Sequence, residues 1–350
     1  AVVAVGDLDV KTLKAKIEKH FGSIAKAKNP KKRETFELPN HEETLVSIAS
    51  DKEAPFTRVQ VVYKDRFEAP KVETVVDYKE QLTKNLFSTM IEENQRVKLY
   101  GFQEGEFERA KQTFLAQMEK QYNDRDKQES GRMVNEFVNN FLENEPIPGI
   151  EWEYKTSKEI LPTITLAEVN ELINQFIHED NRVIILTGPE KEGLKQPTEA
   201  EVMALLKEVE TSKVEPYKDA EVRQNLVENL KPEGSIVKTE QNEALGTTTF
   251  TLSNGATVTV KPTDFKNDEV LFEAFSFGGT SLYSDEDYLA TAFANQGLAE
   301  AGIGGLSKTD LSKMMSGKIA SVSPYIRNLT EGLSGQAAPK DLETLFEMIY

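Results

Sequence analysis

Apolar residues recur along the chain with two different periods. Over residues 10–21 they are three or four positions apart, the spacing of a helix with one apolar face, and Gly22 follows as its C-cap. Over residues 57–63 apolar and polar residues alternate, which is typical of a half-buried strand. Residues 183–187 form a strongly apolar run that ends at Gly188-Pro189 and predicts another strand.

The same two periods predict the remaining elements. Helices are expected at residues 75–95, 107–122, 132–142, 166–176, 198–210, 288–298, 306–315 and 342–350, with a short one at 219–230. Strands are expected at residues 1–5, 45–49, 247–252, 256–260, 270–277 and 319–322. Because the strands lie in hairpins, the fold class is α+β, with antiparallel-rich sheets packed with helices, rather than a doubly wound parallel sheet.

One hairpin carries a clear turn signal. Ser253-Asn254-Gly255 separates the strands at 247–252 and 256–260. The Asn-Gly pair predicts a type I′ turn, because both residues tolerate the positive φ angles that this turn needs.

The length of 350 residues favours two domains. Residues 211–245 are rich in Lys, Glu and Asn and contain Pro216 and Pro232, which is typical of an interdomain linker. The predicted organisation is therefore a first domain at residues 1–210, a linker at 211–245, and a second domain that starts at 246 and runs to 350.

The formal charge of −17 argues against nucleic-acid binding, which needs Lys and Arg on the phosphates. There is no cysteine, so neither a disulfide framework nor a thiolate metal site can form. No apolar run approaches the ~20 residues that span a bilayer. The lack of cysteine favours the periplasm or cell envelope over the alternative, the cytoplasm.

The two ends of the sequence suggest a fragment of a longer polypeptide. The chain opens on the apolar run Ala1–Val5, without Met and without a basic segment that would indicate a signal peptide. It ends in the apolar helical pattern of residues 345–350, with no stop signal.

Three histidines, His20, His41 and His178, are the only imidazoles in the chain. A zinc peptidase helix needs two histidines and a glutamate on adjacent turns, as in H-E-x-x-H or H-x-x-E-H. Because no two histidines here lie within five residues, neither motif exists, and each histidine is interpreted as structural. The sequence therefore predicts no catalytic, cofactor-binding or metal-ligating residue.

Two glycine-rich segments resemble functional motifs without completing them. Residues 332–336, Gly-Leu-Ser-Gly-Gln, lack the final glycine of a nucleophile elbow. Residues 302–305, Gly-Ile-Gly-Gly, are followed by Ser307 where a dinucleotide fingerprint needs its last glycine. Both segments are interpreted as turns.

Several segments, in order and at matching spacing, resemble the insulinase/pitrilysin family of zinc metallopeptidases. They are Val3–Asp9 with His20-Phe21-Gly22, Glu106–Lys111, Phe141–Ile150, Leu252–Gly255 and Gly278–Ser281. The resemblance implies four homologous α+β domains, of which the first carries H-x-x-E-H and a distal glutamate. By the same resemblance this chain is the second domain, the linker and part of a third, degenerate domain, and both family-type domains can be incomplete.

The resemblance also allows a test for a zinc site in the third domain. The zinc helix falls at residues 289–295, with the ligands near Thr291 and Asn295 and the catalytic glutamate near Ala294. None of these side chains can ligate zinc well or activate water. The helix is expected only to pack, with Leu289, Ala292 and Phe293 on its core face.

A departure from the family lies near residues 91–100, where the family pattern is longer, and it suggests an internal deletion. The function implied by the resemblance is a non-catalytic central fragment of a zinc-dependent endopeptidase, forming chamber wall and linker for peptide substrates. Zinc and an upstream catalytic domain are then expected in the parent protein, with neither nucleic acid nor a membrane span. The alternative is a fragment of a non-catalytic homologue that acts as scaffold or partner subunit.

Overall fold

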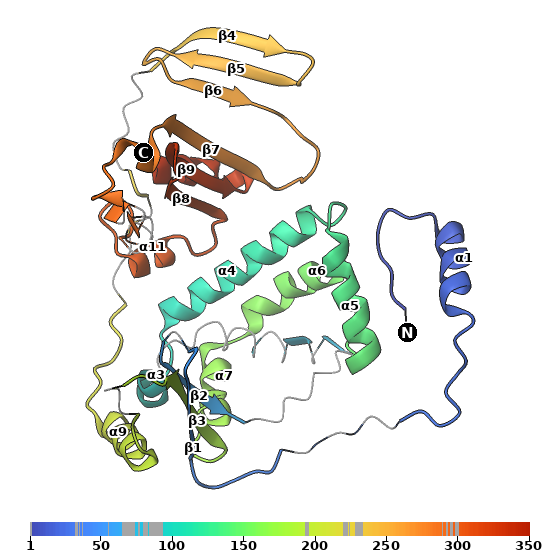
Figure 1. Ribbon diagram of the computed structural model, residues 1–350, viewed down its shortest axis with the longest axis vertical. Coiled ribbons are helices and arrows are strands. Elements are labelled where there is room, and N and C mark those ends of the chain that lie inside the picture. Colours follow the sequence, from blue (N-terminus) through green and yellow to red (C-terminus); the bar gives the residue numbers. More distant parts are fainter. Residues whose placement is uncertain are drawn as a thin grey trace. The chain divides into compact units, whose positions relative to one another are not determined.

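The computed structural model describes residues 2–350 except 32–33, 35, 37, 55, 65–73, 76–77, 80–82, 84–93, 193–195, 220–222, 224, 228–233, 289, 292, 295–296 and 298–300. The chain divides into two compact units, each drawn from separate stretches of sequence. The first contains residues 1–107, 129–148 and 159–219, and the second contains residues 108–128, 149–158 and 220–350. Figure 1 shows the elements that make up each unit.

The first unit is built on a three-stranded sheet with the strand order β1-β3-β2. Its strands are β1 (Leu45–Asp51), β2 (Arg58–Tyr63) and β3 (Arg182–Pro189), and β3 pairs parallel to β1 and antiparallel to β2. Ile184 and Leu186 of the central strand are buried. A strand flanked on both edges and covered on its faces must be apolar at nearly every position, which explains the apolar run in its sequence.

The helices of the first unit are mostly short. They are α1 (Val10–Phe21), α3 (Asn94–Tyr100), α5 (Ser130–Glu143), the 3₁₀ turn η1 (Leu161–Thr163), α7 (Leu166–Glu171), α8 (Ile173–Phe176) and α9 (Glu199–Thr211). Thr165 and Thr198 each close a capping box at the start of α7 and α9. Arg182 is buried in this unit, where Nη1 donates to Oε1 of Glu210 at 2.7 Å and Nε donates to Oγ1 of Thr44 at 2.9 Å.

The second unit contains two further three-stranded sheets, with the orders β4-β5-β6 and β7-β9-β8. The strands are β4 (Ile236–Asn242), β5 (Thr247–Leu252), β6 (Thr257–Val260), β7 (Val270–Phe277), β8 (Ala320–Ile326) and β9 (Thr330–Ala337). All of their pairings are antiparallel. Of the strand pairs among the described residues, only β1–β3 is parallel, which confirms the predicted antiparallel-rich α+β class.

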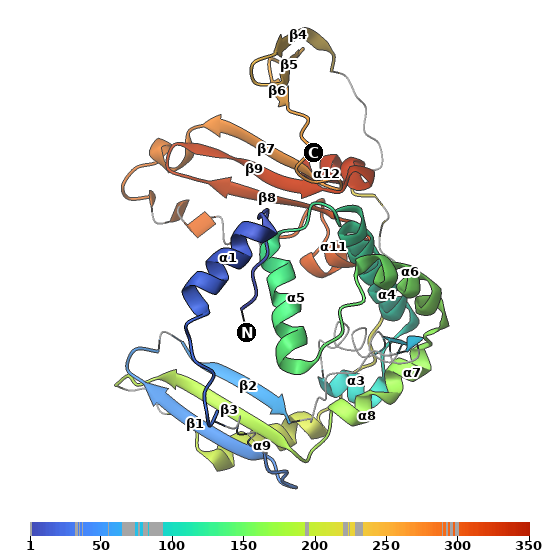
Figure 2. The same cartoon turned by 90° about the vertical axis from the view of Figure 1, so that its right-hand side faces the viewer.

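The helical part of the second unit comes from two distant parts of the sequence. It includes α4 (Glu104–Asn123, from Glu108 onward), α6 (Ile150–Ile160, up to Lys158), η2 (Gly279–Leu282), α11 (Lys308–Met314), η3 (Pro339–Asp341) and α12 (Leu342–Ile349). Helices α4 and α6 lie side by side in both views (Figures 1 and 2). The ring of Tyr122 on α4 stacks on the ring of Tyr154 on α6, with centroids 4.8 Å apart. Helix α12 packs on β8 and β9, and Leu345 is fully buried there.

Several of the described elements were missed by the sequence pattern, and three of them show why. Helix α6 has charged residues at five of its eleven positions and follows Gly149 without a capping side chain that would signal its start. Strand β4, inside the segment predicted as linker, is exposed at every position and so lacks apolar alternation. Strand β9 contains Gly332 and Gly335, which were wrongly interpreted as turn residues. A Cβ at Gly335 would lie 2.6 Å from the carbonyl oxygen of Ser321, so this glycine permits close strand packing.

Other predictions need local correction. Residues 2–5 form no strand in the described part of the chain, where Val2 and Val3 are exposed and have no ladder partner. The hairpin turn at 253–255 is not type I′. Among the described non-glycine residues only Asn144 and Asn181 have positive φ, whereas Gly255 has φ 88° and donates its N–H to the Leu252 carbonyl. This is the three-residue loop in which a single left-handed glycine follows a tight turn.

The predicted helix at 166–176 is divided at Leu172. The N–H of this residue bonds back three positions to Val169, which tightens the turn and ends α7. The predicted helices at 75–95 and 219–230 lie largely outside the described residues, and so does part of the proposed deletion near 91–100. Residues 94–100 of that segment form α3.

Candidate functional site

The helical segment at 288–297 contains the positions where the peptidase family would carry its zinc-binding helix. Thr291 is buried, and its hydroxyl donates to the carbonyl oxygen of Asp287 at 3.0 Å. Ala294 is half-buried and carries only a methyl group, and Asn295 lies outside the described residues. A hydroxyl already bonded within its own helix and a methyl group do not make a zinc site.

The same segment corrects one packing prediction. Phe293 was placed on the core face, but its side chain is 60% exposed. Residues two positions apart on a helix are separated by about 200° around its axis, so their side chains lie on nearly opposite sides. Since Thr291 faces inward, Phe293 faces outward. The predicted core positions Leu289 and Ala292 lie outside the described residues.

The structure pairs the segments that carry His41 and His178, which lie 137 positions apart in the sequence. The N–H of Asn181 donates to the carbonyl of His41 at 2.9 Å, and the N–H of His41 donates to Oδ1 of Asn181 at 2.8 Å. His178 lies just before this pairing, with Nδ1 2.5 Å from the carbonyl oxygen of Asp180 and its ring edge against Tyr63. No sequence spacing signals this proximity, because it depends on the pairing of residues 41–44 with residues 179–182.

In both His41 and His178 the Nδ1 ring nitrogen lies against a backbone carbonyl oxygen. Nδ1 of His41 lies 2.5 Å from the carbonyl oxygen of Glu43, while its Nε2 is buried without a hydrogen-bond partner in the described part of the chain. His20 is exposed in the last turn of α1, where a positive charge is favoured by the helix dipole. Among the described residues, no group of three or more His, Asp or Glu side chains could hold a metal ion.

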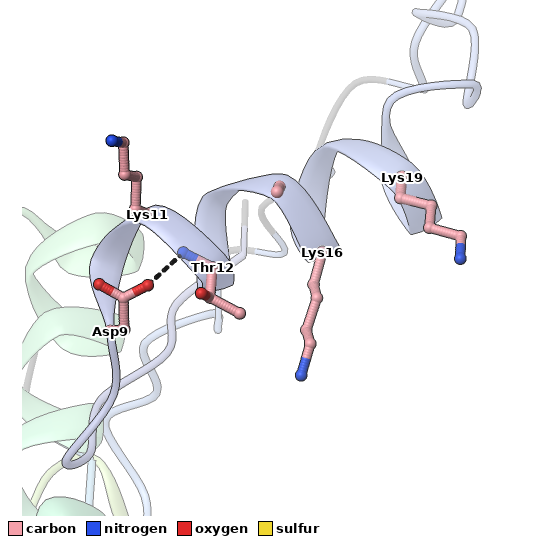
Figure 3. Close-up of a pocket in the computed structure, with 6 residues that line it drawn as sticks. Asp9, Lys11, Thr12, Lys16 and Lys19 are labelled. Atoms are coloured by element: carbon pink, nitrogen blue, oxygen red, sulfur yellow. Dashed lines mark hydrogen bonds between the residues drawn. The ribbon is translucent and has the colours of Figure 1, made fainter.

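A shallow hollow lies on one side of α1 and is lined by Asp9, Thr12, Ala15 and three lysines. Oδ2 of Asp9 accepts the N–H of Thr12 at 2.7 Å and caps the helix (Figure 3). Hydrogen bonding from the Thr12 side chain, followed by that from its backbone N–H, lowers the pKa of Asp9. Lys11, Lys16 and Lys19 extend away from one another (Figure 3). Because these cations diverge, they do not form a pocket for one anionic ligand.

Two glutamates have shifted pKa values, and both belong to ion pairs. The hydrogen bond from Lys79 at 2.6 Å lowers the pKa of Glu168, whose carboxylate also caps α7 through Thr165. The hydrogen bond from Lys340 likewise lowers the pKa of Glu119. A lowered pKa keeps a carboxylate ionised at neutral pH, so neither residue is tuned to be a general acid. These residues therefore stabilise the fold.

The described residues contain no helix long and apolar enough to cross a membrane. No model of a known protein family matches the chain. The chain is 28% identical over 340 residues to a zinc protease PQQL-like protein of Arabidopsis thaliana, which covers 90% of this chain and 35% of that protein. It is 23% identical over 255 residues to a probable zinc protease PqqL of Haemophilus influenzae, covering 72% of this chain and 27% of the relative.

The chain thus spans about a third of the length of these relatives. Its fold is similar to that of the ferredoxin protease FusC, solved in complex with Arabidopsis ferredoxin. The TM-score is 0.50 at 16% identity, over 98% of this chain and 44% of that one. The sequence and fold comparisons agree with the segments that resembled a peptidase family, and they extend over most of the chain.

Proposed function

Since the chain is insulinase/pitrilysin-like, we propose that it forms a non-catalytic central section of a zinc-dependent endopeptidase, serving as chamber wall and linker for peptide substrates. The observation that carries this proposal is the alignment along 90% of the chain with only 35% of a zinc protease PQQL-like protein. A section of this extent leaves room for a separate catalytic domain in the parent protein. The peptidase activity, the zinc and the upstream catalytic domain all belong to that parent.

The wall role is supported by the sheet edges. Strands β1 and β2 are the outer strands of one sheet, and β7 and β8 are the outer strands of another. An extended peptide can add to such an edge through backbone hydrogen bonds. We also propose the division into residues 1–210, a linker at 211–245 and a degenerate domain from 246 to 350.

The catalytic role of the parent is tested by peptide cleavage. The parent protein, expressed with the sequence that precedes this chain, should cleave unstructured peptides, and a chelator should abolish cleavage until zinc is restored. Cleavage that is absent, or that is indifferent to the chelator, would favour the alternative in which the parent is a scaffold or partner subunit. At the sequence level, an H-x-x-E-H motif in the parent would support the endopeptidase, and its absence would support the scaffold or partner subunit.

We also propose that this chain holds no metal ion of its own, and this part of the proposal has a separate test. After dialysis the chain should hold far less than one zinc per molecule, measured by elemental analysis. The matched control is the chain carrying Thr291→His, Ala294→Glu and Asn295→His, which supplies the missing side chains. About one tightly held zinc in the unmodified chain would contradict the proposal.

The compartment is proposed from composition. A chain without cysteine suits the periplasm or cell envelope, where free thiols would be oxidised. Fractionation of cells that express the parent protein should place it there, and recovery with cytoplasmic markers would support the alternative.

A further inference from the structure

The turn that follows α4 holds a loop from the far end of the sequence. Oδ1 of Asp124 accepts the backbone N–H groups of Asn267 at 2.8 Å and of Asp268 at 3.0 Å. In return, Nδ2 of Asn123 donates to Oδ2 of Asp268 at 3.1 Å. More than 140 residues separate the two partners in sequence, and all of them belong to the second compact unit.

Asp124 stands at an unusual place for a carboxylate. It follows directly on the last residue of α4, where the helix dipole disfavours negative charge, and it is only 7% exposed. A buried carboxylate in that position needs strong hydrogen-bond donors. The two N–H groups of the loop supply them, so Asp124 is suited to recognising this loop rather than to stabilising its own helix.

The loop offers further groups that match the turn. Nδ2 of Asn267 donates to the carbonyl oxygen of Asn123 at 2.9 Å and to Oδ1 of Asp126 at 2.6 Å. Nζ of Lys266 donates to the carbonyl oxygen of Lys127 at 3.1 Å. The hydrogen bonds therefore run in both directions and use backbone and side chains on each side, which specifies one register of the loop on the turn.

Two ion pairs flank these hydrogen bonds. Nζ of Lys120 lies 3.9 Å from Oε2 of Glu269, and Lys340, in the middle of η3, pairs with Glu119. Helix α4 and the C-terminal segment each contribute one acidic and one basic residue to these pairs. The contact therefore does not require opposite net charges on the two segments. Together the contacts extend from Glu119, near the end of α4, to Lys127 in the turn that follows it.

We propose that residues 119–127 form a docking site for the loop 266–269 and that this site holds residues 219–350 to the α4–α6 helix pair without help from the covalent connection between them. The partner is defined by its chemistry: a loop with two successive free N–H groups, an asparagine amide and a lysine. Asp124 is the positioning residue of the site.

The test uses the whole chain, cleaved after folding. A recognition sequence for a specific protease is inserted between Lys218 and Asp219, which are both exposed. After cleavage the two pieces should co-elute on size exclusion, and their dissociation constant is then measured at increasing salt. Pieces that separate on cleavage of the otherwise unmodified chain would overturn the proposal.

Substitutions identify the part played by each group. Asp124→Ala should weaken binding about 100-fold, because it removes two hydrogen bonds to a charged acceptor, each worth tenfold or more. Asp124→Asn, which keeps an oxygen acceptor, should lose about tenfold, and Asn267→Ala, on the exposed loop, about tenfold as well. The matched control is Asp264→Ala, which removes an exposed carboxylate from the same loop and should change binding less than about twofold.

Circular dichroism of the uncleaved variants shows whether each one folds. If Asp124→Ala does not fold, Asn267→Ala still decides the question, because it leaves α4 untouched. Binding of Asn267→Ala or Asp124→Ala as tight as that of Asp264→Ala would contradict a docking site centred on Asp124.

Discussion

Helices α1 and α12 share an amphipathic pattern but differ in what they cover. No residue of α1 is buried, and its apolar residues Val10 and Phe21 are 77% and 48% exposed. Helix α12 instead lies on β8 and β9, where Leu345 is fully buried and Phe346 contacts Phe272 edge to face. An apolar stripe therefore shows that a helix can pack against another element. The helix is stabilised only when that stripe is buried against a sheet or a second helix.

The largest test of this difference removes the buried anchor of α12. Leu345→Ala should destabilise the second unit by about 2–5 kcal/mol, because a fully buried leucine leaves a cavity. Urea unfolding followed by the fluorescence of Trp152, the single tryptophan and a residue of this unit, measures the change. Tyr350→Ala, at an 83% exposed position, is the control and should stay within ~0.5 kcal/mol. Equal effects of the two changes would mean that α12 is no better anchored than α1.

A second test adds a methyl group at Gly335 of β9, where the strand lies against Leu345 of α12. A Cβ at Gly335 would lie 2.6 Å from the carbonyl oxygen of Ser321 and 3.1 Å from Cδ1 of Leu345. Gly335→Ala should therefore cost about 1–3 kcal/mol through overpacking, measured by the same unfolding curves. Gly246→Ala is not a suitable control because of its positive φ. Gly234→Ala, in the same unit, meets only Oγ of Ser253 at 4.0 Å and should be neutral or slightly stabilising.

A third test varies pH. The hydrogen bond from Lys340 lowers the pKa of Glu119 below its ordinary value of 4.5, so this pair stabilises the fold at neutral pH and is lost as pH falls through the lowered pKa. For Lys340, burial acts to lower the pKa, but the bond and charge of Glu119 outweigh it and raise the pKa above 10.5. The lysine's contribution is present below pH 10.5 and is lost as pH rises through the raised pKa.

Both partners are partly exposed, so solvent screening limits the pair to less than about 1 kcal/mol. Glu119→Gln should therefore flatten the pH dependence of the Trp152 unfolding transition below pH 4.5. An unchanged acid limb in this variant would show that the pair contributes nothing to stability.

The smallest effect is expected on α1. Phe21→Ala should change unfolding of the chain by no more than ~0.5 kcal/mol, since the ring is about half exposed and covers no buried residue of its own helix. Amide hydrogen exchange over residues 10–21 should be fast in the wild-type chain and little altered by the change. A loss above about 1 kcal/mol would show that α1 is packed in solution, and the comparison with α12 would fail.

The predictability of the fold depended on how local each signal was. Helix α9 was located to within one residue, because Thr198 and Glu201 form a capping box and an apolar pattern follows. Strand β7 was located at its observed bounds from its alternating residues. By contrast, β9 could not be recognised, since its glycines are explained only by the strands and the helix that pack on them.

The candidate site was less accessible to sequence reasoning. The spacing of the histidines was enough to exclude a zinc peptidase motif within the chain, because such a motif lies on two turns of one helix. The pairing of the His41 and His178 segments and the capture of the 266–268 loop by Asp124 were not predictable. Both are contacts between segments more than 130 residues apart, and a single carboxylate after a helix resembles any solvated acidic residue.

The topology of the first unit also determines when its strands can pair during synthesis. Leu45 of β1 pairs with Val183 of the central strand, about 140 residues later. During synthesis β1 and β2 therefore emerge well before the strand that joins them, and Val59 and Val61 wait without a ladder partner. A ribosome that stalls between residues 64 and 181 would present these strands to chaperones or to other nascent chains, so the speed of translation through this interval should affect how much folded protein is obtained.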